Sequence, residues 1–186
     1  IVEKFKAITG ISERRYAENH LTASDLGALA AEKAIADAGI DAETLDYIIL
    51  AHNFGDVKSG SVQSDILPCL AARVKNSLKI KNPKCVAYDI LFGCPGWVEG
   101  VIQAQAFIKA GMAKRCLVIG AETLSRVVDP HDRDSMIYSD GAGATIIETS
   151  DDDGGILSHE SASYTLDEVY HLFFGCSNNK SSEEDT

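Results

Sequence analysis

The stretch Tyr88-Asp89-Ile90-Leu91-Phe92-Gly93-Cys94-Pro95-Gly96-Trp97 decides the fold, because an apolar run typical of a strand changes within it to a helical pattern. Gly93 and Gly96 permit a tight turn. Pro95 suits the first helical position, because its φ is fixed and it lacks an N–H. Cys94 is therefore predicted where a helix begins, and the unpaired N–H groups and helix dipole there favour a thiolate. The pattern predicts a strand, a nucleophile and a helix in that order.

A second interpretation of Cys94 stays open, because free cysteine is among the most buried residue types and packs as a small apolar side chain. The other cysteines help to weigh the two. Cys85 and Cys116 fall in strand-like runs and Cys69 in a helical pattern, so we expect these three in the core. Cys176 lies near a polar tail, where the pattern indicates nothing.

The rest of the chain alternates between helical and strand patterns. One helix is expected to start at Ser24 or Asp25, which offer N-caps, and to stop at Gly39. A second is expected from about Ser61 through Val74, and the helix after Cys94 to run to about Ala110, with Gly111 as its stop. Strands are expected at residues 47–51, 85–90, 116–121, 142–148 and 156–161. This alternation predicts an α/β fold with a mostly parallel sheet and helices on its faces.

Composition narrows the class of protein. The 186 residues carry a formal net charge of −11, which argues against a nucleic-acid or anionic-membrane partner. No apolar run approaches the roughly 20 residues needed to span a membrane. The 5 cysteines, an odd number without a paired spacing, argue against a disulfide scaffold or a zinc site and favour a reducing compartment. We therefore expect a cytoplasmic protein.

One basic segment departs from the acidic average. Residues 66–88 contain no acidic side chain and carry five basic ones: Arg73, Lys75, Lys79, Lys81 and Lys84. A solvated helix end and loop explain this adequately. The alternative is a docking patch for an acidic protein partner or for the phosphate groups of a ligand.

Four segments occur in this order: Thr9-Gly10-Ile11-Ser12-Glu13-Arg14, Gly93-Cys94-Pro95-Gly96, Val118-Ile119-Gly120-Ala121-Glu122 running on to Asp129-Pro130-His131-Asp132-Arg133, and Ser139-Asp140-Gly141-Ala142-Gly143-Ala144. Together they resemble the N-terminal half of the thiolase superfamily, closest to β-ketoacyl-acyl-carrier-protein synthase III. The match extends to about Ser161. It implies the first half of a duplicated α/β/α/β/α fold.

The resemblance also implies a mechanism. Cys94 accepts an acyl group from a thioester, and its backbone N–H helps to hold the oxyanion. Malonyl carrier protein then loses carbon dioxide and attacks the acyl group, giving a 3-oxoacyl product. No permanently bound cofactor is implied; acyl-coenzyme A or acyl carrier protein is the substrate. Relatives pair as homodimers through the strand that leads to the nucleophile, here about 85–91.

The histidine and asparagine of the second step come from the later half in this family. None of the five histidines occurs in a matching motif, so we expect them on the surface or in loops. They are His20, His52, His131, His159 and His171.

Arg133 is the candidate substrate-binding residue, because the family's matching arginine lies against the adenine end of coenzyme A and a guanidinium suits both stacking and phosphate contacts. An ion pair with Asp129, Asp132 or Asp134 is the alternative. Lys4 and Ile8 occupy the neighbourhoods of the family's usual tryptophan and arginine, so a carrier-protein donor stays open.

Other candidates carry weaker signals. The segment Asp140–Ala144 lacks the third glycine of a dinucleotide loop, and its small residues are expected to let a strand pack closely beside the catalytic turn. Asp140 and Glu122 fit an acid–base pair or buried capping carboxylates equally well.

The resemblance leads us to expect an incomplete enzyme. Residues 1–162 form the half with the nucleophile, 163–186 an uncertain connecting segment or polar tail, and the C-terminal half is absent. The helix after Cys94 is apolar nearly all round, which predicts burial on every side. The family's opening strand, expected near the middle of the sheet, is missing, and residues 1–8 have no assigned element.

Three alternative functions stay open. They are an acyltransferase without decarboxylation, a noncatalytic thiolase-fold partner subunit and an α/β small-ligand binding module.

Overall fold

A computed structural model describes residues 2–151, 154–175 and 177–179, and its centre is a four-stranded sheet in the order β4-β1-β5-β6. β1 pairs in parallel with both β4 and β5, whereas β6 runs antiparallel to β5. The strands are β1 (Tyr47–His52), β4 (Val86–Leu91), β5 (Arg115–Thr123) and β6 (Asp140–Glu148). The carboxyl ends of β1, β4 and β5 therefore meet at one edge, which is where α/β proteins place their sites.

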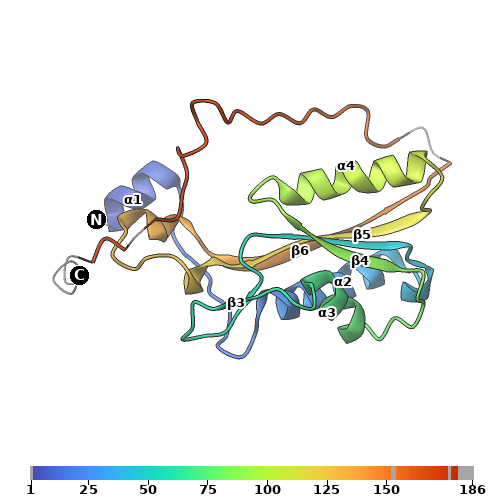
Figure 1. Ribbon diagram of the computed structural model, residues 1–186, viewed down its shortest axis with the longest axis horizontal. Coiled ribbons are helices and arrows are strands. Elements are labelled where there is room, and N and C mark those ends of the chain that lie inside the picture. Colours follow the sequence, from blue (N-terminus) through green and yellow to red (C-terminus); the bar gives the residue numbers. More distant parts are fainter. Residues whose placement is uncertain (1, 152–153, 176, 180–186) are drawn as a thin grey trace.

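Helices cover both faces of this sheet, as Figure 1 shows. α2 (Ala23–Ala38) and α3 (Leu70–Ser77) lie on one face, and α4 (Gly96–Lys109) lies on the other. Successive residues of β1 serve opposite faces: Ile48 and Leu50 pack with α2 and α3, whereas Ile49 packs with α4. Because β1 is buried on both faces, it reads as a continuous apolar run. The predicted α/β fold is confirmed.

The remaining elements are short. They are α1 (Val2–Thr9), the antiparallel pair β2 (Asp56–Val57) and β3 (Ser64–Asp65), and 3₁₀ turns at Ala42–Thr44, Leu124–Arg126 and Arg133–Ile137. α1 occupies the N-terminal residues for which no element was predicted. None of the helices in the described ranges is long and apolar enough to cross a membrane.

The ends of α2 follow capping rules, with a shift at its start. Gly39 ends the helix at φ 64°, as predicted. The N-cap is Thr22 rather than Ser24 or Asp25, because the Asp25 carboxylate reaches back to accept a hydrogen bond from the Thr22 N–H at 2.8 Å. Ser24 is instead tied to Asp56 through its N–H and hydroxyl, at 2.7 and 2.6 Å.

The helix predicted from about Ser61 is wrong over its first part. β3 occupies part of that region, and α3 begins only at Leu70. Pro68 explains the difference, because it has no N–H and disfavours a helical conformation at the preceding residue. The side chains that supplied the early apolar spacing also stay in water: Ile66 is 44% exposed and Leu67 is 82% exposed.

The sheet does not lack a central strand, contrary to expectation. β1 and β5 pair directly from Tyr47 opposite Cys116 to Ala51 opposite Gly120. The edges of the described sheet are β4 and β6. The buried backbone N–H and C=O groups that face each other between β1 and β5 are therefore paired.

The strand predicted at residues 156–161 is also absent. This segment runs extended over the outer side of α4 (Figure 1), where Gln105 Nε2 donates to the Ile156 carbonyl at 3.1 Å and Ser161 Oγ donates to Glu99 Oε2 at 3.0 Å. Its two apolar residues, Ile156 and Leu157, are adjacent and meet no sheet face, and Leu157 is 94% exposed. A strand needs a partner strand and a surface to cover, and the described residues offer neither here.

α4 is only partly covered. Gly96, Gly100 and Ala104 are buried against the sheet, whereas Trp97 is 39% exposed and Val98 is 51% exposed. The expected burial on every side is therefore not reached within the described residues, because the segment over the outer side contacts the helix at only a few points.

Candidate active site

Cys94 lies at the junction between β4 and α4. β4 ends at Leu91 and α4 begins at Gly96, with the Gly96 N–H donating to the Gly93 carbonyl at 2.8 Å to close the turn. Pro95 is the N-cap rather than the first helical residue. Cys94 itself is exposed. The predicted strand–turn–helix junction is confirmed, and the thiol is open to a substrate.

The glycines at this junction are needed for close approach. Neither Gly93 nor Gly96 has a positive φ, so the expected conformational reason does not apply. A Cβ on Gly96 would lie 2.7 Å from the Ala51 Cβ, and one on Gly93 would lie 3.2 Å from Asn53 Oδ1. One turn further along, a Cβ on Gly100 would lie 2.7 Å from Val118 Cγ1. The missing side chains let α4 start directly on the carboxyl ends of β1 and β5.

The loop after β1 lies against the Cys94 turn. Asn53 donates its backbone N–H and its Nδ2–H to Glu122 Oε2, at 2.6 and 3.0 Å. Glu122 lies near the end of β5, so Asn53 bridges two strand ends beside Gly93. The Glu122 carboxylate thus has a structural role, because it accepts the hydrogen bonds that hold Asn53. Sequence reasoning missed Asn53, because a single asparagine after a strand carries no spacing signal.

His52 corrects the expectation that every histidine lies on the surface or in a loop. It is the last residue of β1, and its side chain is 1% exposed. Its Nδ1 accepts the Gly55 N–H at 2.9 Å, so Nε2 carries the proton and donates to Asp89 Oδ2 at 3.0 Å. The other four histidines are exposed, as expected.

Asp89 gathers three donors. Besides His52, it accepts the N–H groups of Leu70 and Ala71, both at 2.7 Å, at the start of α3. Burial acts to raise the pKa of Asp89, but the hydrogen bonds from His52, Ala71 and Leu70 outweigh it and lower the pKa below its ordinary value. Asp89 is therefore a carboxylate fixed between β4, β1 and α3.

The other described cysteines differ from Cys94. Cys85 and Cys116 are buried, as predicted, and burial raises the pKa of Cys85 and raises that of Cys116 to about 12. Cys69 is half-buried, with its Sγ 3.7 Å from the Ala87 carbonyl oxygen. Cys176 lies outside the described residues. Cys94 is therefore the exposed cysteine of the described chain.

Arg133 lies on the surface at the start of a 3₁₀ turn. Its side chain is 78% exposed, and its Nε lies 3.3 Å from Asp134 Oδ1. Asp132 caps the same turn by accepting the Asp134 N–H at 2.9 Å. The structure thus gives Arg133 the ion-pair partner foreseen as the alternative and leaves its remaining nitrogens facing water.

Asp140 holds loops together at the start of β6. Its carboxylate accepts the Ala17 N–H at 2.8 Å, the Ser125 N–H at 2.9 Å and the Ser125 hydroxyl at 2.7 Å. A carboxylate with three such donors is a capping group rather than a free acid or base. The structural interpretation of Asp140 is the one that the geometry favours.

The small residues after Asp140 lie in β6 and leave space. A Cβ on Gly141 or Gly143 would meet nothing within 4 Å, so the expected close packing beside the turn is wrong. Gly143 instead lines an open pocket of about 370 Å³ together with Trp97, Gly120, Ala144 and Thr145. This pocket lies beside the first turn of α4.

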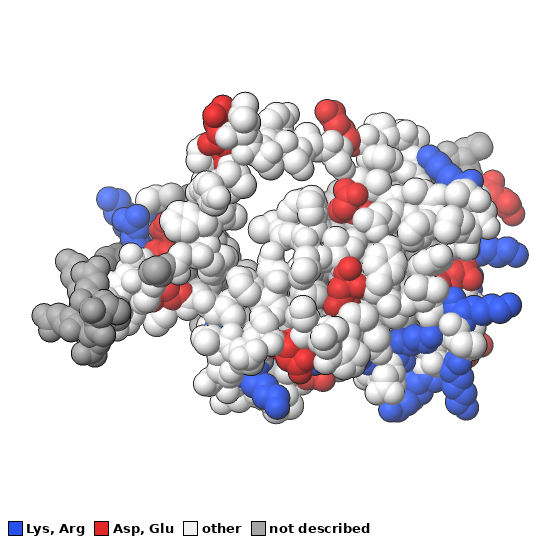
Figure 2. Space-filling model, in the orientation of Figure 1, with Lys and Arg blue, Asp and Glu red and all other residues white. Residues whose placement is uncertain are grey.

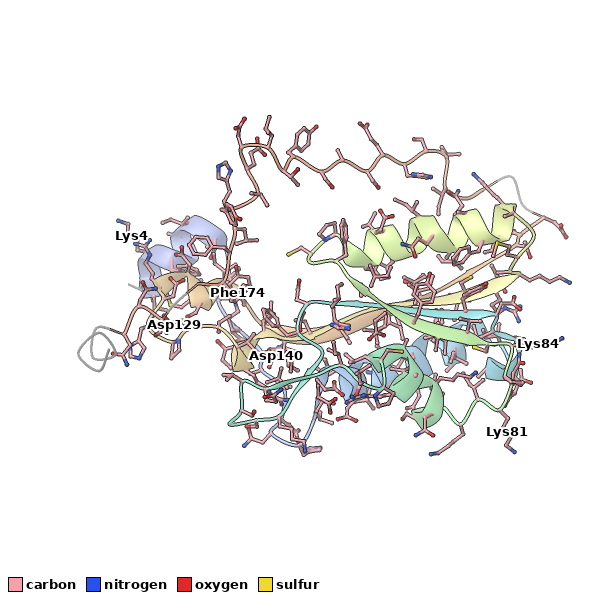
Figure 3. All side chains as sticks on the ribbon, in the orientation of Figure 1. Lys4, Lys81, Lys84, Asp129, Asp140 and Phe174 are labelled. Atoms are coloured by element: carbon pink, nitrogen blue, oxygen red, sulfur yellow. The ribbon has the colours of Figure 1, made fainter. Side chains whose placement is uncertain are left out.

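The basic segment lies away from Cys94. Figure 3 shows Lys81 and Lys84 at one end of the sheet and Asp140, which marks the carboxyl edge, toward the other. Figure 2 shows blue side chains gathered at the Lys81 end. Arg73 is paired with Asp56 and Asp65 at 2.8 and 2.6 Å, whereas Lys79, Lys81 and Lys84 are exposed. These contacts fit a solvated helix end and loop.

The fold and this site define an α/β protein in which an exposed cysteine opens a helix at the carboxyl edge of a mostly parallel sheet. The family model described as 3-oxoacyl-[acyl-carrier-protein (ACP)] synthase III matches residues 88–165. The chain is therefore a thiolase-superfamily protein of the β-ketoacyl-[acyl-carrier-protein] synthase III type, matched over the N-terminal part of that fold.

Individual relatives agree with this assignment. The chain is 41% identical over 154 residues to β-ketoacyl-[acyl-carrier-protein] synthase III 1 of Vibrio vulnificus (strain YJ016), covering 82% of this chain and 46% of that protein. The crystal structure of 3-oxoacyl-[acyl-carrier-protein] synthase III from Aquifex aeolicus VF5 superposes with a TM-score of 0.66 at 35% identity, covering 80% and 46% of the two chains. The priming β-ketosynthase of the R1128 polyketide pathway gives 0.71 at 26%, covering 83% and 43%. The chain thus spans about half the length of the curated relatives that it matches.

Proposed function

We propose that the protein is a condensing enzyme of fatty-acid or polyketide synthesis, of the β-ketoacyl-acyl-carrier-protein synthase III type, with Cys94 as its nucleophile. One observation carries the proposal: the exposed Cys94 thiol stands at the start of α4, at the carboxyl edge of the sheet. Relatives named for this activity align with the chain, which supports the assignment. An intact nucleophile turn argues against a noncatalytic partner subunit.

The first step is acyl transfer to sulfur. The Cys94 thiolate attacks the thioester carbonyl, a bond forms between Sγ and the acyl carbon, and the coenzyme A or carrier thiolate leaves and takes up a proton. The described residues give the Cys94 backbone N–H no acceptor, so it is free to donate to the oxyanion.

The second step forms the carbon–carbon bond. Malonyl carrier protein releases carbon dioxide, and the resulting carbanion attacks the acyl-cysteine carbonyl to give a 3-oxoacyl product and free Cys94. We infer that the histidine and asparagine of this step lie outside residues 1–186. His52 cannot serve, because both of its ring nitrogens are engaged and its side chain is buried.

The acyl donor is a thioester of coenzyme A or of acyl carrier protein. We propose Arg133 as a contact for the donor, because its guanidinium is 78% exposed and close to only one carboxylate, that of Asp134. Lys4 and Ile8 occupy the neighbourhoods of the family's usual tryptophan and arginine, so the test includes a carrier-protein donor as well as coenzyme A.

We also propose a homodimer formed along β4. β4 is an edge of the described sheet, and two of its apolar side chains are exposed: Val86 at 46% and Leu91 at 66%. An exposed apolar edge strand is a surface on which a second strand pairs. The odd number of cysteines supports a cytoplasmic location.

The test is mass spectrometry of the full-length protein after incubation with acyl-coenzyme A or acyl carrier protein. We expect one acyl group on Cys94, none in Cys94→Ala, and unchanged labelling in Cys69→Ala. Labelling that persists in Cys94→Ala overturns the nucleophile assignment. Adding malonyl carrier protein then separates the two reaction classes: release of carbon dioxide with loss of the label indicates condensation, and a stable label indicates simple acyl transfer.

A further inference from the structure

A buried pair of side chains, His52 and Asp89, joins two strand ends near the Cys94 turn. His52 ends β1 and Asp89 lies two residues before the end of β4. Their side chains are 1% and 11% exposed, and both lie on the face of the sheet that carries α3. The Cys94 turn lies on the opposite face, so the pair does not touch a substrate there.

The hydrogen-bonding capacity of the imidazole is fully used. Nδ1 accepts from Gly55 and Nε2 donates to Asp89, which also holds the N–H groups of Leu70 and Ala71. A neutral imidazole offers one donor and one acceptor. The contacts therefore select one tautomer and one ring orientation, and they fix the end of β1 relative to β4 and α3.

The backbone next to His52 is the surface on which the Cys94 turn rests. Ala51 faces α4 and lies under Gly96, where a Cβ would come within 2.7 Å. Asn53 lies beside Gly93, where a Cβ would come within 3.2 Å of its Oδ1. A shift of His52 thus moves both supports of the turn, because it is bonded covalently to each.

We propose that His52 and Asp89 are positioning residues that hold the Cys94 turn in its reactive geometry from the opposite face of the sheet. The inference rests on the proposed role of Cys94 as the nucleophile. Neither side chain takes part in the chemistry. Their contribution is to fix the positions of Ala51 and Asn53 relative to the start of α4. The close contacts of these two residues with the Cys94 turn tolerate little displacement.

The principal test is Asp89→Asn in the full-length protein. A carboxamide has one acceptor oxygen and adds two donors, so it cannot satisfy the three N–H groups that converge on Asp89. We expect the rate of Cys94 alkylation by iodoacetamide in the folded protein to fall by about tenfold, because a displaced turn no longer keeps the sulfur at the start of α4, where a helix N-terminus favours the reactive thiolate. Circular dichroism checks that the variant is folded.

Asp46→Asn is the matched control. Asp46 Oδ2 also accepts two backbone N–H groups, those of Lys114 and Arg115 at 2.7 and 3.1 Å, but next to the opposite end of β1. We expect a comparable loss of thermal stability and an alkylation rate unchanged within about twofold. An equal slowing in both variants overturns the inference, because it makes the effect one of general stability.

A second variant and a spectroscopic measurement complete the test if Asp89→Asn does not fold. His52→Gln leaves Asp89 on the start of α3 and removes the acceptor for Gly55, and we expect the same slowing of alkylation. In the unmodified protein, ¹⁵N shifts of the His52 ring should show the neutral form protonated at Nε2; any other form at neutral pH overturns the inference.

Failure of the inference is distinguishable from failure of the proposed function. If Cys94 of the unmodified protein reacts no faster than Cys94 of the unfolded chain, the nucleophile assignment and the inference both fail. If it reacts faster and neither His52→Gln nor Asp89→Asn slows it, the inference alone fails.

Discussion

Gly96 lies against Ala51 with no room for a side chain between them: a Cβ at position 96 would be 2.7 Å from the Ala51 Cβ. This contact fixes where α4 begins relative to the end of β1. Cys94 precedes Gly96 by two residues. The thiol therefore lies at the carboxyl edge of the sheet because Gly96 has no Cβ to keep the helix start away from Ala51.

The same close packing predicts that Gly100→Ala is destabilising. The new Cβ would lie 2.7 Å from Val118 Cγ1, and the short branched valine cannot rotate away cheaply. Overpacking of this kind costs about 1–3 kcal/mol, which exceeds the gain of up to about 1 kcal/mol from replacing glycine in a helix. Urea unfolding of the full-length protein measures the difference.

Gly27→Ala is the control, because it is also a glycine within a helix. Its Cβ would lie 3.4 Å from Leu50 Cδ1, an ordinary contact. We expect stability to be unchanged or to rise by up to about 1 kcal/mol. Equal effects at positions 27 and 100 would show that the sheet does not restrict α4.

Thiol labelling at neutral pH should distinguish the cysteines by burial. Cys94 is exposed, whereas Cys85 and Cys116 are buried and their pKa values are raised by burial. We expect iodoacetamide to modify Cys94 in the folded protein, and the other two only after unfolding. Peptide mapping by mass spectrometry reads out each site. Modification of Cys116 before Cys94 contradicts the structure.

Stability should fall as the solution becomes alkaline. Burial raises the pKa of Tyr88 to about 12 and that of Cys116 to about 12, from ordinary values of 10.0 and 9.0. Between its ordinary pKa and about 12, each group has lost its proton in the unfolded chain but keeps it in the folded protein. The unfolded state therefore binds fewer protons, and the free energy of unfolding decreases as the pH rises. Each group contributes at most about 1.4 kcal/mol per pH unit.

Tyr88→Phe tests the tyrosine contribution. Its hydroxyl donates to Gln103 Oε1 at 2.8 Å, so the variant should lose about 1 kcal/mol at neutral pH and yet show a shallower alkaline decline. Tyr164→Phe, at a side chain that is 73% exposed, should keep the original slope. Urea unfolding at neutral and alkaline pH gives the slopes, and identical slopes for Tyr88→Phe and the unmodified protein would refute the assignment.

The proposed dimer should weaken when a charge is placed on the β4 edge. Val86→Lys puts two like charges close together if two copies pair along β4, which is unfavourable. We expect light scattering of the full-length protein to show a dimer that the variant converts toward monomer. Val62→Lys changes a side chain that is 78% exposed outside the main sheet and should leave the dimer intact. A dimer unaffected by Val86→Lys places the interface elsewhere.

The elements predicted best from sequence are those whose neighbours are near in the chain or whose burial is complete. The strand expected at 47–51 is β1, and the helix expected after Cys94 is α4. The helix expected from Ser61 and the strand expected at 156–161 both lacked a surface for their apolar side chains, and Pro68 also disfavours a helix before it. Ile66, Leu67 and Leu157 are exposed.

By itself, the sequence determined the α/β class, the strand–turn–helix junction and the position of Cys94 within it, because turn chemistry, helix starts and apolar periodicity depend on residues a few positions apart. Only the tertiary structure decided that His52 is buried on Asp89, that Asn53 is held by Glu122 and that Gly96 and Gly100 are required for contact with the sheet. These relationships join residues between 37 and 69 positions apart in the first two cases, and hydrogen bonds and close packing over such separations depend on strand order and register, which no local pattern encodes.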